Sequence, residues 1–195
     1  TVLDNLSGII RPGQLTAIMG PSGSGKTSLM TAIAGRAHYG TLHGSLFLNG
    51  EPIDPKSRDY QRKIGFVPQH DIMHPHLTVF ETLVYTSRIR LPEISRIEQM
   101  RNVNHAISQL RLDNVQHSII GDESRRGISG GQKKRVNIGI EMVAHPSILF
   151  CDEATSGLDA GNSLLVVKML HKIAQDLVTV TTVLHQPREE IFDIF

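Results

Sequence analysis

Residues 15–34 read LTAIMGPSGSGKTSLMTAIA and predict a strand, a glycine-rich loop and a helix in immediate succession. The apolar run from Leu15 to Met19 suits a short buried strand, and the segment from Lys26 to Ala34 is compatible with a helix. The loop between them fits G-x-x-x-x-G-K-[ST], a pattern whose backbone N–H groups can surround a phosphate. This stretch therefore predicts a nucleotide-binding core of mixed strands and helices.

The predicted loop offers each group that a nucleoside triphosphate and its metal require. Glycines let the backbone approach the β-phosphate, Lys26 can neutralise the β and γ oxygens, and the Thr27 hydroxyl can meet Mg²⁺. The residues expected to bind the phosphates of ATP are Gly20, Pro21, Ser22, Gly23, Ser24, Gly25, Lys26, Thr27 and Ser28.

Composition limits the classes of protein that need to be considered. The 195 residues carry a formal net charge of +1 with both signs interspersed, which gives no electrostatic case for nucleic acid as a partner. The one cysteine, Cys151, lies in an apolar run, so we expect a buried thiol in a reducing compartment. No apolar run reaches the roughly 18 residues of a membrane span, and the N-terminus lacks a signal-peptide pattern. We therefore expect a domain on the cytosolic side.

Strand-like and helix-like segments alternate along the chain, which predicts an α/β fold with a largely parallel sheet. Beyond the opening stretch, the core elements are expected as strands at 148–151 and 178–184 and as helices at 160–177 and from 189 onward. Strands of an antiparallel β flank are expected at 2–10, 45–49 and 63–67.

Helical periodicity dominates the middle of the chain. Apolar residues recur at three- and four-residue spacing over 78–90 and 95–112, separated by Pro92, and another helix should run from Gly130 to about Ala144. We predict one domain over 1–195, a P-loop NTPase core formed by 1–70 and 146–195 and interrupted by an inserted α-helical subdomain at 71–145.

Polar residues follow three of the predicted strands. Asp152 and Glu153 end the strand at 148–151, Gln69 follows Pro68, and His185 ends the strand at 178–184. Ligands collect at the carboxyl edge of open parallel sheets. We expect Thr27, Gln69 and Asp152 to hold Mg²⁺, and Glu153 to polarise the attacking water with Gln69 and His185 beside the γ-phosphate.

A second anion site is expected at Ser129, Gly130, Gly131 and Gln132, ahead of a predicted helix. Unpaired N–H groups and the helix dipole favour an anion at a helix N-terminus, although a serine here could also serve only as a helix cap.

Five cations surround this segment: Arg125, Arg126, Lys133, Lys134 and Arg135. They have two interpretations, a solvated helix face or a surface that attracts ATP or contacts a membrane-embedded partner.

The order of these motifs resembles the nucleotide-binding domain of ABC transporters. The runs around Gln69, Ser129 and His185 are similar to the G subfamily, the half-transporters related to the insect White protein and the sterol and lipid exporters. Ala154 departs from this pattern, because the subfamily usually has proline there.

The resemblance implies ATP hydrolysis coupled to export of a lipid, sterol or other hydrophobic compound. It also implies a head-to-tail dimer, homo- or heterodimeric, in which Ser129 to Gln132 act in trans and Leu158 and Asp159 form a D-loop contact. A transmembrane domain of the same polypeptide would follow Phe195, and the aromatic residue that stacks on adenine would precede Thr1. The alternatives are a soluble ABC ATPase of translation or DNA repair, and a nucleotide sensor without catalysis.

Overall fold

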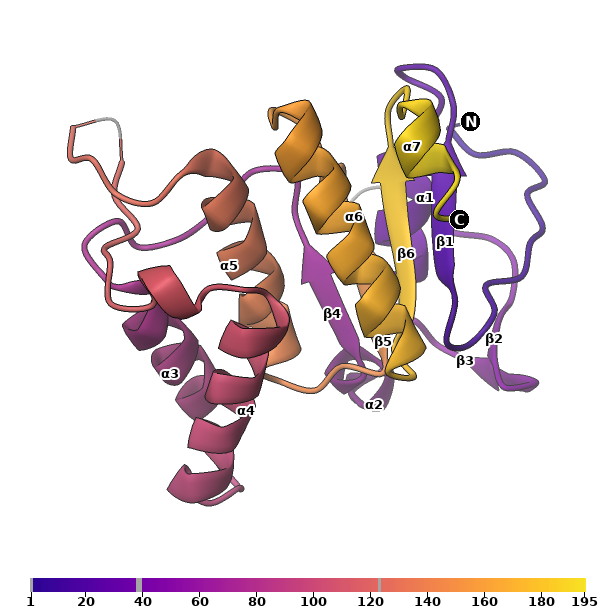
Figure 1. Ribbon diagram of the computed structural model, residues 1–195. Helices are drawn as coiled ribbons and strands as arrows, with labels where there is room; N and C mark the ends of the chain where they lie inside the picture. The colour runs from indigo at the N-terminus through magenta and orange to yellow at the C-terminus, as the bar shows by residue number, and fades with distance from the viewer. Residues whose placement is uncertain (1, 38–39, 123) are drawn as a thin grey trace.

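The protein is described by a computed structural model that covers residues 2–37, 40–122 and 124–195. A parallel sheet has the strand order β1-β6-β5-β4 (Figure 1). Its strands are β1 (Leu15–Met19), β4 (Ile64–Val67), β5 (Ile148–Cys151) and β6 (Thr179–Leu184). A separate antiparallel pair consists of β2 (Leu46–Leu48) and β3 (Glu51–Ile53). The predicted α/β class, with a mostly parallel sheet and an antiparallel flank, is confirmed.

Helices lie on both faces of the parallel sheet and at one end of it. Figure 1 shows α6 in front of the sheet and α1 behind it, with α3, α4 and α5 gathered beyond β4. The helices are α1 (Lys26–Ile33), α2 (Arg58–Arg62), α3 (Val79–Arg90), α4 (Arg96–Gln109), η1 (Asp113–Val115), α5 (Gly130–Met142), α6 (Ala160–Gln175) and α7 (Glu189–Phe192).

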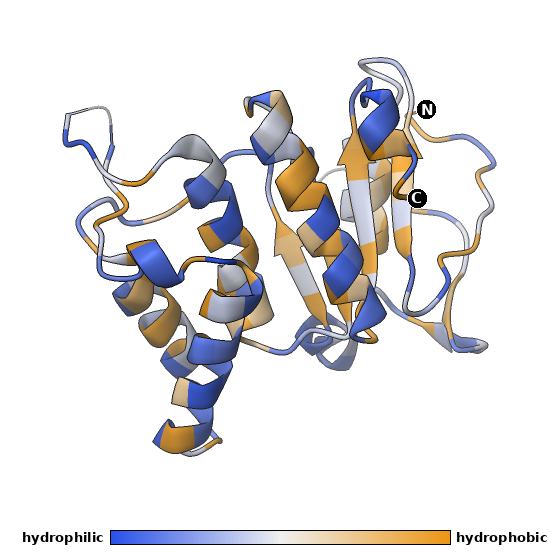
Figure 2. Cartoon of the chain, viewed as in Figure 1, coloured by the Kyte–Doolittle hydropathy of each residue, from blue (hydrophilic) through white to orange (hydrophobic). Residues whose placement is uncertain are grey.

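Strands β4 and β5 are buried on both faces, which explains their nearly continuous apolar sequences. Alternate residues of β4 and β5, among them Phe66 and Phe150, pack with Met30 of α1. The intervening residues, among them Leu149, face the opposite way and join α5 and α6 in a second, larger cluster. Figure 2 shows the apolar colouring along these strands and the mixed colouring of the covering helices.

The helices of the middle segment begin where the sequence predicts. Thr78, Ser95 and Ser129 are the N-caps of α3, α4 and α5, and each forms a reciprocal capping box with the residue three positions later. The α4 helix ends at Gln109, earlier than expected, because Arg111 adopts a left-handed backbone with φ of 50°.

Two predictions about the flank are wrong. Residues 2–10 form no strand, and Val2 and Ile9 are 70% and 84% exposed, so their alternating pattern has no sheet face to bury against. The segment 63–67 is not part of the antiparallel flank, because β4 pairs in parallel with β5. All four residues of β4 are buried, as expected of a strand covered on both faces.

We expect Phe150→Ala to lower the free energy of unfolding by about 3–5 kcal/mol, because the ring is 1% exposed between the sheet and α1. Urea denaturation followed by circular dichroism measures this change. The matched control is Phe47→Ala in β2, where the ring is 60% exposed and the expected change is within about 0.5 kcal/mol. Equal losses in the two variants would contradict the placement of the core.

Candidate nucleotide-binding site

The direction of the four parallel strands brings the predicted site residues together. The loop predicted to bind phosphate, residues 20–28 and here called the phosphate loop, follows β1. Gln69 follows β4 by two residues, Asp152 follows β5 and His185 follows β6. Because the strands run in parallel, these segments all start at the carboxyl ends of the strands, which are together called the carboxyl edge of the sheet. The site is therefore assembled from segments that are far apart in the sequence.

The phosphate loop takes a backbone shape that depends on glycine. Gly23 and Gly25 have φ of 77° and 88°, a region that residues with a Cβ rarely adopt. Gly25 lies directly before α1, whose first residue is Lys26. The Lys26 ammonium folds back over the loop, and its Nζ lies 2.9 Å from the carbonyl oxygens of Gly20 and of Pro21. The loop thus holds a cation against its own backbone at the start of a helix, an arrangement suited to an anion.

Thr27 and Asp152 meet across the sheet edge. The Thr27 hydroxyl donates to Oδ1 of Asp152 at 3.0 Å, although the two residues are 125 positions apart in the chain. Asp152 is buried, and this burial raises the pKa of its carboxyl, while the hydrogen bond from Thr27 acts in the opposite direction. A nearby cation would favour the charged carboxylate, so these two oxygen donors fit a magnesium ion.

Gln69 and Glu153 form a second pair at this edge. Nε2 of Gln69 donates to Oε2 of Glu153 at 2.9 Å. The backbone of Glu153 has φ of 48°, a left-handed conformation that is uncommon outside glycine and asparagine. The Gln69 amide oxygen remains available as a hard ligand, so Gln69 can be grouped with Thr27 and Asp152 as a candidate for the metal.

His185 lies at the end of β6, between the phosphate loop on β1 and the carboxylates on β5 in sheet order. Its side chain is exposed, and Gln186 directly after it has φ of 45°. The chain bends at these two residues, directly after the carboxyl end of β6. No hydrogen bond of His185 to another site residue occurs within the described parts of the chain.

The residues Ser129 to Gln132 form the beginning of α5, where Ser129 and Gly130 are exposed and Gly131 is buried. The Ser129 N–H donates to Oε1 of Gln132 at 2.7 Å, and the Gln132 N–H donates to the Ser129 hydroxyl at 3.3 Å. Figure 1 shows α6 between the start of α5 and strand β1, so this segment does not join the phosphate loop of the same chain. The structure therefore presents two separate candidate anion sites.

Leu158 and Asp159 lie next to the start of α5. A Cβ on Gly130 would be 4.0 Å from Cδ2 of Leu158, and one on Gly131 would be 2.5 Å from Oδ1 of Asn162. Asp159 is the N-cap of α6 and accepts from the Asn162 N–H at 2.9 Å. Hydrogen bonds from the Asn162 backbone and side chain hold the pKa of Asp159 below its usual value. A side chain at position 131 would therefore force the Asn162 side chain to move.

The interpretation of the basic cluster as a solvated helix face is wrong for two of its five residues. Arg125 and Arg126 are exposed, but Lys134 and Arg135 are buried. One guanidinium nitrogen of Arg135 donates to the carbonyl oxygens of Leu110 and Arg111 at 3.0 and 2.8 Å. The α5 helix is covered by α3, α4, α6 and β4. Two of its cations are therefore buried, and the sequence does not indicate the backbone carbonyls that accept their hydrogen bonds.

Sequence reasoning also missed a polar network beside Gln69. Nζ of Lys134 lies 2.8 Å from the Gln69 carbonyl oxygen and 2.8 Å from Oδ1 of Asp71, and Asn137 donates to the same Asp71 oxygen at 2.9 Å. The only sequence signal would have been the acidic residue two positions after Gln69.

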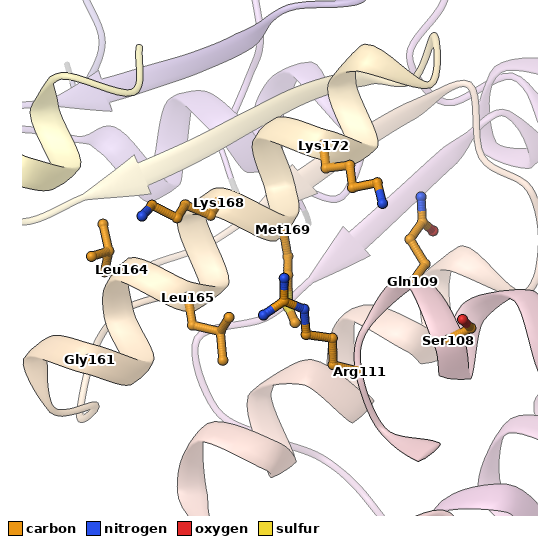
Figure 3. Close-up of a pocket in the computed structure, with 9 residues that line it drawn as sticks. All are labelled: Ser108, Gln109, Arg111, Gly161, Leu164, Leu165, Lys168, Met169 and Lys172. Carbon is orange, nitrogen blue, oxygen red and sulfur yellow. The ribbon is translucent and has the colours of Figure 1, made fainter. Parts of the chain in front are cut away.

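A groove of about 410 Å³ lies away from the candidate site (Figure 3). Its walls come from the end of α4, from Arg111 and from α6, and none of the predicted nucleotide-binding residues lines it. The candidate site is instead the open edge of the parallel sheet. Among the described residues, no helix is both long and apolar enough to cross a membrane.

Comparison with known proteins gives consistent matches over the chain. Residues 3–156 match the protein-family model described as ABC transporter. The chain is 48% identical over 195 residues to ABC transporter G family member 21 of Arabidopsis thaliana, covering 100% of the chain and 28% of that relative. For ABC transporter G family member 14 of the same plant, the identity is 43% over 196 residues, with 100% of the chain and 30% of the relative covered.

A Saccharomyces cerevisiae protein named Probable ATP-dependent permease is 44% identical over 197 residues, covering 100% of the chain and 19% of the relative. The chain spans less than a third of the length of each of these relatives. The chain therefore belongs to the ABC transporter family, within which it is an ATPase domain of the G type.

Proposed function

We propose that this domain binds Mg·ATP at the sheet edge and hydrolyses it to power export by a G-type ABC transporter. The observation that carries the proposal is that two hydrogen-bonded pairs of side chains lie at the carboxyl ends of the parallel strands. Thr27 donates to Asp152 at 3.0 Å, and Gln69 donates to Glu153 at 2.9 Å, beside a phosphate loop with a folded-back Lys26.

The phosphate loop supplies the binding energy for the triphosphate. Backbone N–H groups between Gly20 and Ser28 surround the β-phosphate, and Lys26 exchanges its bonds with two loop carbonyls for the β and γ oxygens. Because an ammonium presents three donors, Lys26 can retain one loop contact while it binds phosphate.

Thr27, Asp152 and Gln69 would hold the magnesium ion. They offer a hydroxyl, a carboxylate and an amide oxygen, the hard oxygen donors that Mg²⁺ prefers, and the Thr27–Asp152 distance of 3.0 Å places two of them side by side. When bound, the metal neutralises charge that develops on the phosphate oxygens.

Glu153 acts as the general base that accepts a proton from the attacking water. Its carboxylate is held by the Gln69 amide, so its orientation depends on the segment that follows β4. His185 leaves the neighbouring strand β6 and donates to the γ-phosphate, where it distinguishes ATP from ADP. Gln69 links the metal, the base and the helices beyond β4.

Two copies of the domain complete each ATP site. Within the segment Ser129 to Gln132, Gly130 and Gly131 offer N–H groups and Ser129 a hydroxyl, at a helix start that α6 separates from the phosphate loop of its own chain. We assign this segment to the γ-phosphate bound by a partner domain, with Leu158 and Asp159 at the dimer contact. The partner is a second nucleotide-binding domain, either identical or different.

The helices α3, α4 and α5 support a division of the chain into an ATP-binding core of residues 1–70 and 146–195 and a helical subdomain of residues 71–145. The subdomain would transmit the nucleotide state to a transmembrane domain of the same polypeptide, with this domain on the cytosolic face. The exported compound would be a lipid, a sterol or another hydrophobic molecule. Relatives named as transporters and as a permease favour export over a soluble ATPase of translation or DNA repair.

We expect Glu153→Gln to lower the rate of ATP hydrolysis by about a hundredfold or more and to retain ATP binding, because the amide cannot accept the proton of the attacking water. Phosphate release and nucleotide binding are measured on the same protein. Glu93→Gln, at an exposed position between α3 and α4, makes the same chemical change away from the site and should hydrolyse normally. Normal turnover in Glu153→Gln would place the base elsewhere.

We expect Lys26→Ala to abolish measurable ATP binding, because the buried ammonium is the cation that the loop holds for the β and γ oxygens. Isothermal titration calorimetry measures the affinity. Lys172→Ala, which removes an exposed lysine of α6, is the matched control and should bind ATP as the native protein does. Retained affinity in Lys26→Ala would refute the assignment of this loop.

We expect Ser129→Arg to leave ATP bound at Lys26 and to prevent closure of the dimer, because a long side chain would enter the space of the partner's γ-phosphate. Light scattering in the Glu153→Gln background measures ATP-dependent dimers. Ser129→Ala removes the hydroxyl, which is both a helix cap worth about 1 kcal/mol and one donor to the partner's γ-phosphate, and should impair dimerisation less than Ser129→Arg. Ser147→Arg adds the same bulk at the exposed residue before β5, at the opposite sheet edge. Normal dimerisation of Ser129→Arg would show that this segment does not act in trans.

A further inference from the structure

A buried cation of α5 contacts the segment that carries Gln69. Lys134 is 2% exposed, and its Nζ lies 2.8 Å from the Gln69 carbonyl oxygen and 2.8 Å from Oδ1 of Asp71. An ammonium removed from water is costly to bury unless it is paired and hydrogen-bonded. Lys134 satisfies both conditions with two residues of a single segment, so its position is closely tied to that of Gln69.

A second residue of α5 strengthens the attachment. Asn137 is three positions after Lys134, on the same helix face, and its Nδ2 donates to Oδ1 of Asp71 at 2.9 Å. The carboxylate of Asp71 thus receives two donors from α5, and the Gln69 carbonyl receives one. These bonds fix the backbone at Gln69 relative to α5.

The α5 helix and Gln69 each belong to one part of the proposed ATP site. The helix begins at the segment proposed to contact the partner's nucleotide, and Gln69 contacts the proposed base, Glu153. The helix starts beside Ser129, and Lys134 is about 6 Å further along at 1.5 Å per residue. The Gln69 side chain donates to Oε2 of Glu153 at 2.9 Å. A continuous path of bonded groups therefore runs from the helix that begins after Ser129 to the carboxylate of Glu153.

We propose that Lys134 is a positioning residue for hydrolysis, which sets the Gln69 amide against Glu153 according to the position of α5. The inference rests on the proposed function. When the start of α5 meets the nucleotide of the partner, a shift of the helix moves Lys134 and, through two bonds to the 69–71 segment, the Gln69 amide. Hydrolysis in one site thereby depends on how Ser129 to Gln132 of the same chain contact the nucleotide in the other site.

A purely structural role is the competing explanation, and a second ion pair of α5 allows it to be separated. Arg90 of α3 and Glu141 of α5 are 2.6 Å apart, and Glu141 is buried. This pair also attaches α5 to its surroundings, but no hydrogen bond joins it to the 69–71 segment among the residues described. Loss of either ion pair should destabilise the fold, whereas only loss of the Lys134 pair should change the position of Gln69.

The test compares Lys134→Met with Arg90→Met in purified full-length protein. We expect Lys134→Met to lower kcat by about tenfold with KM for ATP within about twofold, and to raise the Mg²⁺ concentration for half-maximal activity, as changes to the groups that orient metal ligands do. Arg90→Met should lower the melting temperature and keep the native kcat and Mg²⁺ dependence. Asp71→Asn weakens the same ion pair and should shift kcat in the same direction as Lys134→Met.

A double-mutant cycle with Gln69→Ala decides whether the effect passes through Gln69. If Lys134 acts on the Gln69 side chain, Lys134→Met should change kcat little further once that side chain is absent. Fully additive losses, or native kcat in both Lys134→Met and Asp71→Asn, would overturn the proposal. Absence of ATPase activity in the native protein, or full activity in the Glu153→Gln variant, would instead contradict the proposed function.

Discussion

The common direction of the four strands in the parallel sheet is the constraint on which the rest of the structure depends. The ladder β1-β6-β5-β4 aligns the carboxyl ends of all four strands, so the four segments that follow them meet at one edge. Thr27 reaches Asp152 for this reason, although 125 positions separate them in the chain. Burial of both sheet faces fixes the register, because a slip of one residue would exchange the side chains that pack on α1 with those that pack on α6.

The α5 helix is the second organising element, and it carries several charged side chains that are buried. Lys134, Arg135 and Glu141 are each less than a tenth exposed, and each is paired with a carboxylate, a guanidinium or backbone carbonyls. Such pairs contribute little net stability compared with apolar packing, but removing one partner leaves an uncompensated charge. These bonds therefore hold α5 against three neighbours: Lys134 against the 69–71 segment, Arg135 against the end of α4, and Glu141 against α3.

The sequence predicted most elements because their signals are local. The strand at 148–151 agrees in both limits with β5, and the helix starts at Thr78, Ser95 and Ser129 agree because capping residues mark them chemically. Errors arose where a local pattern does not tell which sheet a segment joins, or whether it joins one. Residues 2–10 alternate like a strand but have no sheet to join, and β4 carries a short apolar run that the sequence could not place on one sheet or the other.

By itself, the sequence determined the phosphate loop, the carboxylates after β5 and the order of the motifs, because these depend on residue type and spacing along the chain. Only the tertiary structure decided that Lys134 is buried against Gln69 and Asp71, that Gln69 reaches Glu153, and that α6 separates the start of α5 from the phosphate loop. The physical reason is that hydrogen bonds and burial join groups brought together by the parallel sheet and by helix packing. Neither the spacing nor the composition of the chain specifies these contacts.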